Sequence, residues 1–170
     1  MTRYAAFLRG VNVGGVNLKM ADVADALTHA GFTDVRTLLA SGNVLLDSPE
    51  NAATVRATAE AALRERFGYQ AWVLVYDIGT LRGIVEGFPF EPEVNGWHSY
   101  VTFVADETVL SELAPLAEAH EKITLGDGVI YWQIPKGDTL TSAVGRTMGN
   151  RRYAPCTTTR NLRTLSKVLR

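Results

Sequence analysis

The chain has 170 residues, 46% of them hydrophobic, so it should bury about two thirds of the surface of its unfolded form and fold without a disulfide or metal. It has a single cysteine, no apolar stretch at its start and no apolar run near the roughly 20 residues of a membrane-spanning helix. Its net charge of −1 and pI near 6.3 argue against a broad basic surface for nucleic acid. We therefore expect a cytoplasmic protein with no signal peptide, no internal disulfide and no membrane segment.

The first part of the chain predicts a strand, a helix and a hairpin. Residues 3–9 favour a strand, which stops at the glycine-rich run 10–17. Apolar residues at helical spacing then predict a helix over 20–31. Residues 35–39 and 44–46 predict two short strands. The small, turn-forming residues between them predict a hairpin, in which the two strands are antiparallel.

A second helix and a fourth strand follow. Ser48, with proline and glutamate after it, is a strong helix start, and the helix is expected to reach Phe67 and to end at Gly68. Residues 70–76 then favour a strand, and apolar residues at 81–85 favour a short helix. The order of these elements is βαββαβ.

The composition of residues 87–97 places a subdomain boundary there, because its prolines and glycines resist both helix and central strand. Beyond it, residues 99–105 predict a strand and 107–119 a helix. Residues 122–125 and 129–135 predict a hairpin.

The end of the chain predicts a helix over 140–148, a strand at 152–156 and a terminal helix. Leu162, Leu165, Val168 and Leu169 fall on one face of that terminal helix, and Arg163, Lys167 and Arg170 on another. The order βαββαβ thus occurs twice.

Charge is distributed unevenly along the chain. Residues 1–138 carry 10 Lys and Arg against 18 Asp and Glu, whereas residues 139–170 carry 7 Lys and Arg and no acid. Local fields, rather than net charge, attract an anion. The last fifth is therefore either a solvated basic surface that balances an acidic body or an anion site.

Three motifs are far from generic: Tyr4-Ala5-Ala6-Phe7-Leu8-Arg9-Gly10-Val11-Asn12-Val13-Gly14-Gly15, Ala40-Ser41-Gly42-Asn43-Val44 and Thr158-Thr159-Arg160-Asn161. With them the chain closely resembles the uncharacterised bacterial family DUF1697 over essentially its whole length. The resemblance implies an α+β fold of duplicated ferredoxin-like subdomains, which we place at 1–88 and 98–170, and it implies no activity. Members of the family commonly have a small residue at the position of Cys156. This departure weakens the case that Cys156 acts as a nucleophile.

The glycine-rich run is the first candidate ligand site. Its glycines, among them Gly14 and Gly15, allow positive φ angles that turn backbone N–H groups inward as an anion-binding nest. Arg9 and Lys19 add positive charge, and Asn12 and Asn17 add amide groups. The alternative is an ordinary strand-to-helix connection in which Asn17 caps the helix.

A second candidate lies near the end of the chain, where Thr158, Arg160 and Asn161 stand at an expected helix start. The alternative for the threonines is that one of them caps that helix. Arginine in a first helical turn opposes the helix dipole, so a bound anion or a buried carboxylate should offset it. Ser41 and Asn43 either form the hairpin turn or line one pocket with Arg9 and Arg160. The expected ligand-binding residues are Arg9, Asn12, Gly14, Gly15, Asn17, Lys19, Ser41, Asn43, Thr158, Arg160 and Asn161.

Other chemistry has weaker support in the sequence. The three histidines are scattered, and no Cys/His spacing matches a metal site, so we expect no metal and no cofactor. Cys156 is expected to be a packed thiol, and no Gly-x-Ser-x-Gly motif is present. Whether the protein is an enzyme stays open.

Three functions remain. The first is binding, with or without turnover, of a phosphorylated or carboxylated small molecule. The second is an RNA-binding module that stacks bases on Tyr100, Phe103, Tyr131 and Trp132, although such aromatics are more often core. The third is a module that binds a protein partner or itself. The oligomeric state is left open.

Overall fold

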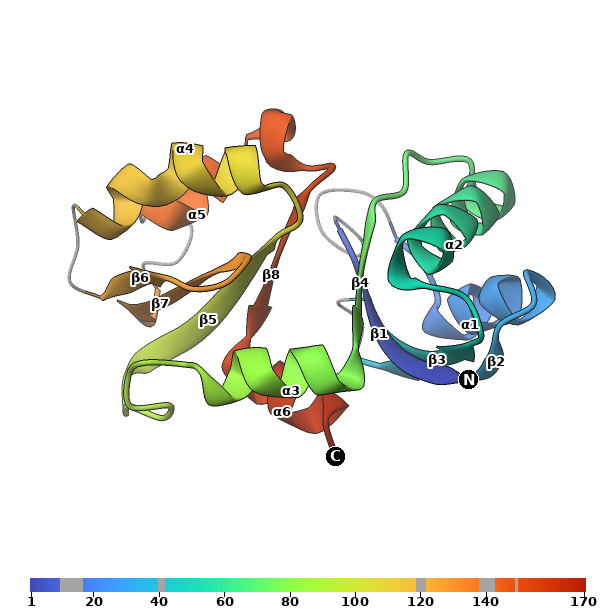
Figure 1. Ribbon diagram of the computed structural model, residues 1–170, viewed down its shortest axis with the longest axis horizontal. Coiled ribbons are helices and arrows are strands. Elements are labelled where there is room, and N and C mark those ends of the chain that lie inside the picture. Colours follow the sequence, from blue (N-terminus) through green and yellow to red (C-terminus); the bar gives the residue numbers. More distant parts are fainter. Residues whose placement is uncertain (10–16, 40–41, 119–121, 138–142, 149) are drawn as a thin grey trace. The chain divides into compact units, whose positions relative to one another are not determined.

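The structure is a computed structural model that describes residues 1–9, 17–39, 42–118, 122–137, 143–148 and 150–170 (Figure 1). The chain divides into two compact units, Met1–Leu81 and Arg82–Arg170. No helix of the described residues is both long enough and apolar enough to cross a membrane.

The first unit is a four-stranded antiparallel sheet with two helices (Figure 1). Its elements are β1 (Thr2–Leu8), α1 (Met20–His29), β2 (Thr33–Leu38), β3 (Asn43–Ser48), α2 (Ala52–Phe67) and β4 (Val73–Asp77). The strand order is β2-β3-β1-β4, and every neighbouring pair is antiparallel. This order and the element sequence βαββαβ are those of a ferredoxin-like unit, as the sequence predicts.

The core of this unit lies between the sheet and its two helices. Leu8 and Leu46 from the sheet pack with Leu27 of α1 and Leu63 of α2, and each is at most 1% exposed. Burying an aliphatic side chain of this kind contributes roughly 1.5–3 kcal/mol. The apolar residues at helical spacing in α1 therefore hold the helix against the sheet.

The start of α2 differs from the prediction. Ser48 does not cap the helix; it ends β3, where it pairs with Thr2, and its Oγ accepts a hydrogen bond from the Glu50 N–H at 3.1 Å. The cap is Asn51, whose side chain accepts from the Thr54 N–H at 2.9 Å. Strand pairing keeps the chain extended through Ser48, so the helix begins later. It ends at Gly68, with φ 66°, as predicted.

The second unit repeats the arrangement of the first (Figure 1). The helix α3 (Ile78–Glu86) contains the division between the units, and it is followed by β5 (Trp97–Val104), α4 (Glu107–Glu118), β6 (Ile123–Leu125), β7 (Val129–Pro135), α5 (Ala143–Met148), a 3₁₀ turn (Arg151–Tyr153), β8 (Thr157–Asn161) and α6 (Leu162–Val168). The strand order β6-β7-β5-β8 is again antiparallel throughout. The duplicated ferredoxin-like fold is confirmed.

Residues 152–156 do not form the strand predicted there. The chain makes a 3₁₀ turn at Arg151–Tyr153, where the Asn150 side chain accepts from the Arg152 N–H at 3.0 Å. The last strand is β8, a few residues later, because Thr157–Asn161 pairs along β5. Within the helix predicted over 140–148, α5 covers Ala143–Met148, and residues 138–142 lie outside the described part of the chain.

The segment between α3 and β5 belongs to the second unit and is hydrogen-bonded to β5 and to the residue after β7. Ser99 Oγ donates to the Pro92 carbonyl at 2.9 Å, and the Lys136 N–H donates to the Gly96 carbonyl at 2.9 Å. The compact units separate at Leu81, ahead of this segment. The subdomain boundary that composition places at 87–97 stays a prediction.

Candidate functional site

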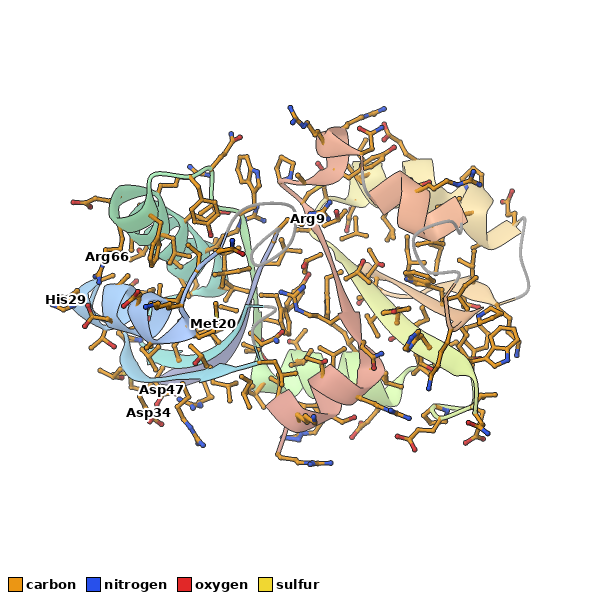
Figure 2. The ribbon with its side chains drawn as sticks, turned by 180° about the vertical axis from the view of Figure 1, so that it is seen from behind. Arg9, Met20, His29, Asp34, Asp47 and Arg66 are labelled. Atoms are coloured by element: carbon orange, nitrogen blue, oxygen red, sulfur yellow. The ribbon has the colours of Figure 1, made fainter. Side chains whose placement is uncertain are left out.

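Arg9 and Asn43 lie at the same end of the first unit's sheet. Phe7 pairs with Asn43, and the Leu8 N–H donates to the Gly42 carbonyl at 2.8 Å, so the end of β1 adjoins the β2–β3 connection. Figure 2 shows Arg9 at this end and Asp34 and Asp47, both ion-paired with Arg3, at the other. The sequence left this relation open, and the structure brings the two predicted residues together.

Asn43 has a structural role at that end. It is fully buried, and its Nδ2 donates to the Leu38 carbonyl at 2.9 Å across the β2–β3 connection. This hydrogen bond is the kind expected if Asn43 serves to form the hairpin turn, the first of the two interpretations that the sequence left open. Ser41, its neighbour in the motif, lies outside the described residues.

The start of α1 is not capped by Asn17. The residue at the cap position is Lys19, which makes no side-chain capping bond, and its carbonyl accepts the first helical hydrogen bonds. Both Asn17 and Lys19 are exposed. Asn12, Gly14 and Gly15 lie outside the described residues, so the nest predicted at the glycine-rich run stays a prediction.

Thr158 and Arg160 do not stand at a helix start, as the sequence suggested. Both belong to β8 and are buried, with 1% and 7% of their surface exposed. An Arg160 guanidinium N–H donates to Thr158 Oγ1 at 2.6 Å and to the Thr159 carbonyl at 3.0 Å. The helix-dipole argument for an anion at Arg160 was therefore wrong. Arg9 and Lys19 belong to the first unit and Arg160 to the second, and their convergence on one cavity stays a prediction.

Asn161 is the predicted residue that lies at a described cavity. Its Oδ1 accepts from the Arg163 N–H at 2.9 Å and caps α6, a role the sequence gave to a threonine. It also lines a pocket of about 200 Å³ in the second unit, where α6, the end of β8 and the start of β5 meet the segment before β5. We call this the basic pocket; its lining residues are Pro92, Glu93, Val94, Trp97, His98, Ser99, Asn161, Leu162, Arg163, Ser166, Lys167 and Arg170.

Positive charge predominates in the basic pocket. Arg163, Lys167 and Arg170 line it and are exposed, whereas Glu93 is the one carboxylate side chain in the lining. Arg163 Nε lies 3.5 Å from Glu93 Oε1, and both side chains are about 70% exposed. Exposed pairs of this kind contribute about 0–1 kcal/mol, so an anion can compete with Glu93. Among the described residues, neither Lys167 nor Arg170 has an ion-pair partner.

Apart from Asn161, the residues that line the basic pocket were not assigned to a ligand site from the sequence. The spacing of Arg163, Lys167 and Arg170 along one helical face was visible in the sequence, and it was the available signal. Glu93 and Trp97 come from the expected boundary segment and carried no such signal. Their contribution depends on the antiparallel pairing of β5 with β8, which puts Tyr100 opposite Asn161.

Burial raises the pKa of two tyrosines in the first unit, Tyr69 and Tyr76, and of Tyr131 in the second, and none of the three lines the basic pocket. Desolvation by burial raises the pKa of Tyr69 to about 12, and the Tyr69 Oη has no hydrogen-bond partner among the described residues. Burial also raises the pKa of Tyr76, opposed by the charge of Arg56. These phenols are neutral at physiological pH, as a tyrosine with its ordinary pKa also is. The described residues include no cluster of three or more histidine, cysteine or acidic side chains placed to hold a metal ion.

Comparison with known proteins identifies the family. Residues 1–131 match the family model described as "Protein of unknown function (DUF1697)". The chain belongs to the DUF1697 family. No curated protein matches it. A solved structure of the conserved bacterial protein SP0830 from Streptococcus pneumoniae has a similar fold, with a TM-score of 0.80 and 21% identity over 99% of this chain and 96% of that one.

The aromatic residues considered for base stacking are mostly core in this DUF1697 protein. Phe103 and Trp132 are 0% and 2% exposed, and Tyr131 is 6% exposed, with its hydroxyl donating to the Ile84 carbonyl at 2.7 Å. Tyr100 stacks on Trp132 with 4.6 Å between ring centroids. Base stacking needs exposed ring faces, so this arrangement does not favour the RNA-binding alternative.

Proposed function

We propose that the protein binds a small anionic molecule, a phosphorylated or carboxylated metabolite, in the basic pocket. The observation that carries the proposal is the excess of three basic side chains, Arg163, Lys167 and Arg170, over one acidic side chain, Glu93, in one concave lining. Cations in a cleft raise the local concentration of anions, and arginine holds a carboxylate or phosphate through two parallel hydrogen bonds.

Lys167 is the cation best suited to a test. It is exposed and lines the pocket, and among the described residues it makes no ion pair, so the Lys167→Gln substitution removes charge without breaking an ion pair there. Arg160, in contrast, is buried and bonded to Thr158. Its replacement would disturb β8 and would not isolate a binding effect.

The test is calorimetric titration with inorganic phosphate at constant ionic strength, because exposed charges are screened by salt. We expect Lys167→Gln to weaken binding about two- to fivefold, the effect of losing one exposed charge interaction of roughly 0.5–1 kcal/mol. Lys136→Gln is the matched control, since Lys136 is exposed in the same unit and lies outside the basic pocket.

Two outcomes would contradict the proposal. The first is absence of phosphate and carboxylate binding to the native protein. The second is equal weakening by Lys167→Gln and Lys136→Gln, which would indicate a diffuse effect of net charge. A short single-stranded RNA titrated in parallel tests the alternative, because RNA binding by phosphate contacts falls steeply with salt.

The glycine-rich run remains a second candidate for the anion-binding site. Arg9 and Lys19 lie at the two ends of residues 10–18, and a nest there would favour the same kind of anion. Lys19→Gln separates the two locations, because the basic pocket predicts no change in phosphate affinity on that substitution.

A further inference from the structure

The basic pocket has an apolar side as well as a charged side. Pro92, Val94 and Trp97 line it from the segment before β5 and the first residue of that strand, and α6 adds Leu162. Arg163 and Lys167 come from other positions of α6, and Arg170 follows the end of that helix. The lining therefore has an apolar part and a cationic part. Water in contact with the apolar side is displaced favourably by an apolar group.

The size of the pocket limits the ligand. Its volume of about 200 Å³ is below the roughly 300–1,000 Å³ of pockets that hold drug-sized molecules. A ligand with one anionic group and one ring fits this scale, whereas a dinucleotide or a long chain does not.

We infer that the ligand of the basic pocket is a compact anion with a planar apolar ring, which lies against Trp97 while its phosphate or carboxylate meets Lys167 and Arg163. The inference rests on the proposed function and names its ligand class. Tryptophan offers a wide flat surface, and offset stacking on it favours a planar ring beyond the area that is buried. Pro92 and Val94 line the same pocket and add apolar surface for the ring.

Three phosphates test the inference: phenyl phosphate, cyclohexyl phosphate and inorganic phosphate. They share the anionic group, whereas the cyclohexyl ring has the apolar surface without the flat face. We expect phenyl phosphate to bind roughly tenfold more tightly than inorganic phosphate, with cyclohexyl phosphate between them. Trp97→Leu should lower the affinity for phenyl phosphate severalfold, a larger loss than it causes for inorganic phosphate.

Fluorescence gives a readout at the site itself. Trp132 is 2% exposed, and Trp72 lies in the first unit under the Arg64 guanidinium, 4.7 Å from its ring centroid. Trp97 is therefore the indole whose emission phenyl phosphate should change. Trp97→Phe keeps an aromatic face and should retain binding while removing the signal.

The inference and the proposed function fail separately. If phenyl phosphate binds no more tightly than inorganic phosphate, or if cyclohexyl phosphate matches it, the planar-ring inference is wrong although the pocket still binds anions. If none of the three phosphates binds, the proposed function is wrong. An affinity for phenyl phosphate that is insensitive to Trp97→Leu would also overturn the inference.

Discussion

At the scale of single residues, Glu93 sets how available Arg163 is to a ligand. Its carboxylate lies 3.5 Å from Arg163 Nε and competes with any anion for the same guanidinium. Glu93→Gln removes this competitor, so we expect phosphate to bind two- to fivefold more tightly, the range of one exposed ion pair. The measurement is the same calorimetric titration, and weaker binding by the variant would show that Glu93 helps to hold the ligand.

Tyr69 provides a prediction on stability. Its hydroxyl has no hydrogen-bond partner among the described residues, and burial raises its pKa to about 12. Tyr69→Phe removes an unsatisfied polar group, so we expect the free energy of unfolding at pH 7 to stay level or rise by up to about 1 kcal/mol. Denaturant titration measures this change. A loss of more than about 1 kcal/mol would mean that the hydroxyl is bonded.

The same residue predicts a dependence on alkaline pH. A raised pKa in the folded state gives a stabilising contribution that is complete below the unfolded value of 10 and is lost as the pH rises through about 12. The native protein should therefore lose stability over this window more steeply than Tyr69→Phe. Parallel slopes for the two proteins would contradict the assignment of the shift to Tyr69.

At the scale of elements, two exposed glycines should respond oppositely to the same substitution. Gly68 ends α2 with φ 66°, whereas Gly83 lies inside α3, and an added Cβ at either would meet no atom within 4 Å. Gly68→Ala forces a side chain into a left-handed conformation and should cost about 1 kcal/mol. Gly83→Ala should stabilise by about 0.5–1 kcal/mol, because alanine restricts the unfolded chain and favours helix. Thermal unfolding of both variants measures the contrast, and shifts of the same sign would contradict it.

Most helices and strands were predicted correctly, because the sequence patterns that favour them are local. The apolar period of α1, the glycine after α2 and the hairpin at Gly126–Gly128 all appear in the structure where they were expected. The predictions were wrong where pairing between strands distant in the sequence determines the local structure. Ser48 resembles a cap, but pairing with Thr2 keeps it in β3; likewise, pairing with β5 places Thr158 and Arg160 in β8.

The candidate site was predictable only in part, for the same reason. Asn161 and the basic face of α6 are local features of the sequence, and they lie at the basic pocket. Trp97 and Glu93 are more than 60 residues away along the chain, and their place in the pocket follows from the β5–β8 pairing. No local pattern carries that information.

At the scale of the whole molecule, the two units should each have a stable centre. β1 and β3 are the inner strands of the first sheet, and β5 and β7 those of the second. We expect their amides to exchange hydrogen most slowly, in two separate sets, because each unit has its own hydrophobic core. Hydrogen exchange with mass spectrometry measures this. Slow exchange confined to one unit would contradict two independent centres.

The measurement that tests the central claim most directly is a titration of the ¹⁵N-labelled protein with inorganic phosphate, followed by the backbone amide and indole resonances. We predict changes that saturate and are concentrated at Trp97, Ser99, Asn161 and Arg163, with few at Arg9 and Lys19. Changes confined to the residues around the glycine-rich run, or no saturable change at all, would contradict binding of an anion in the basic pocket.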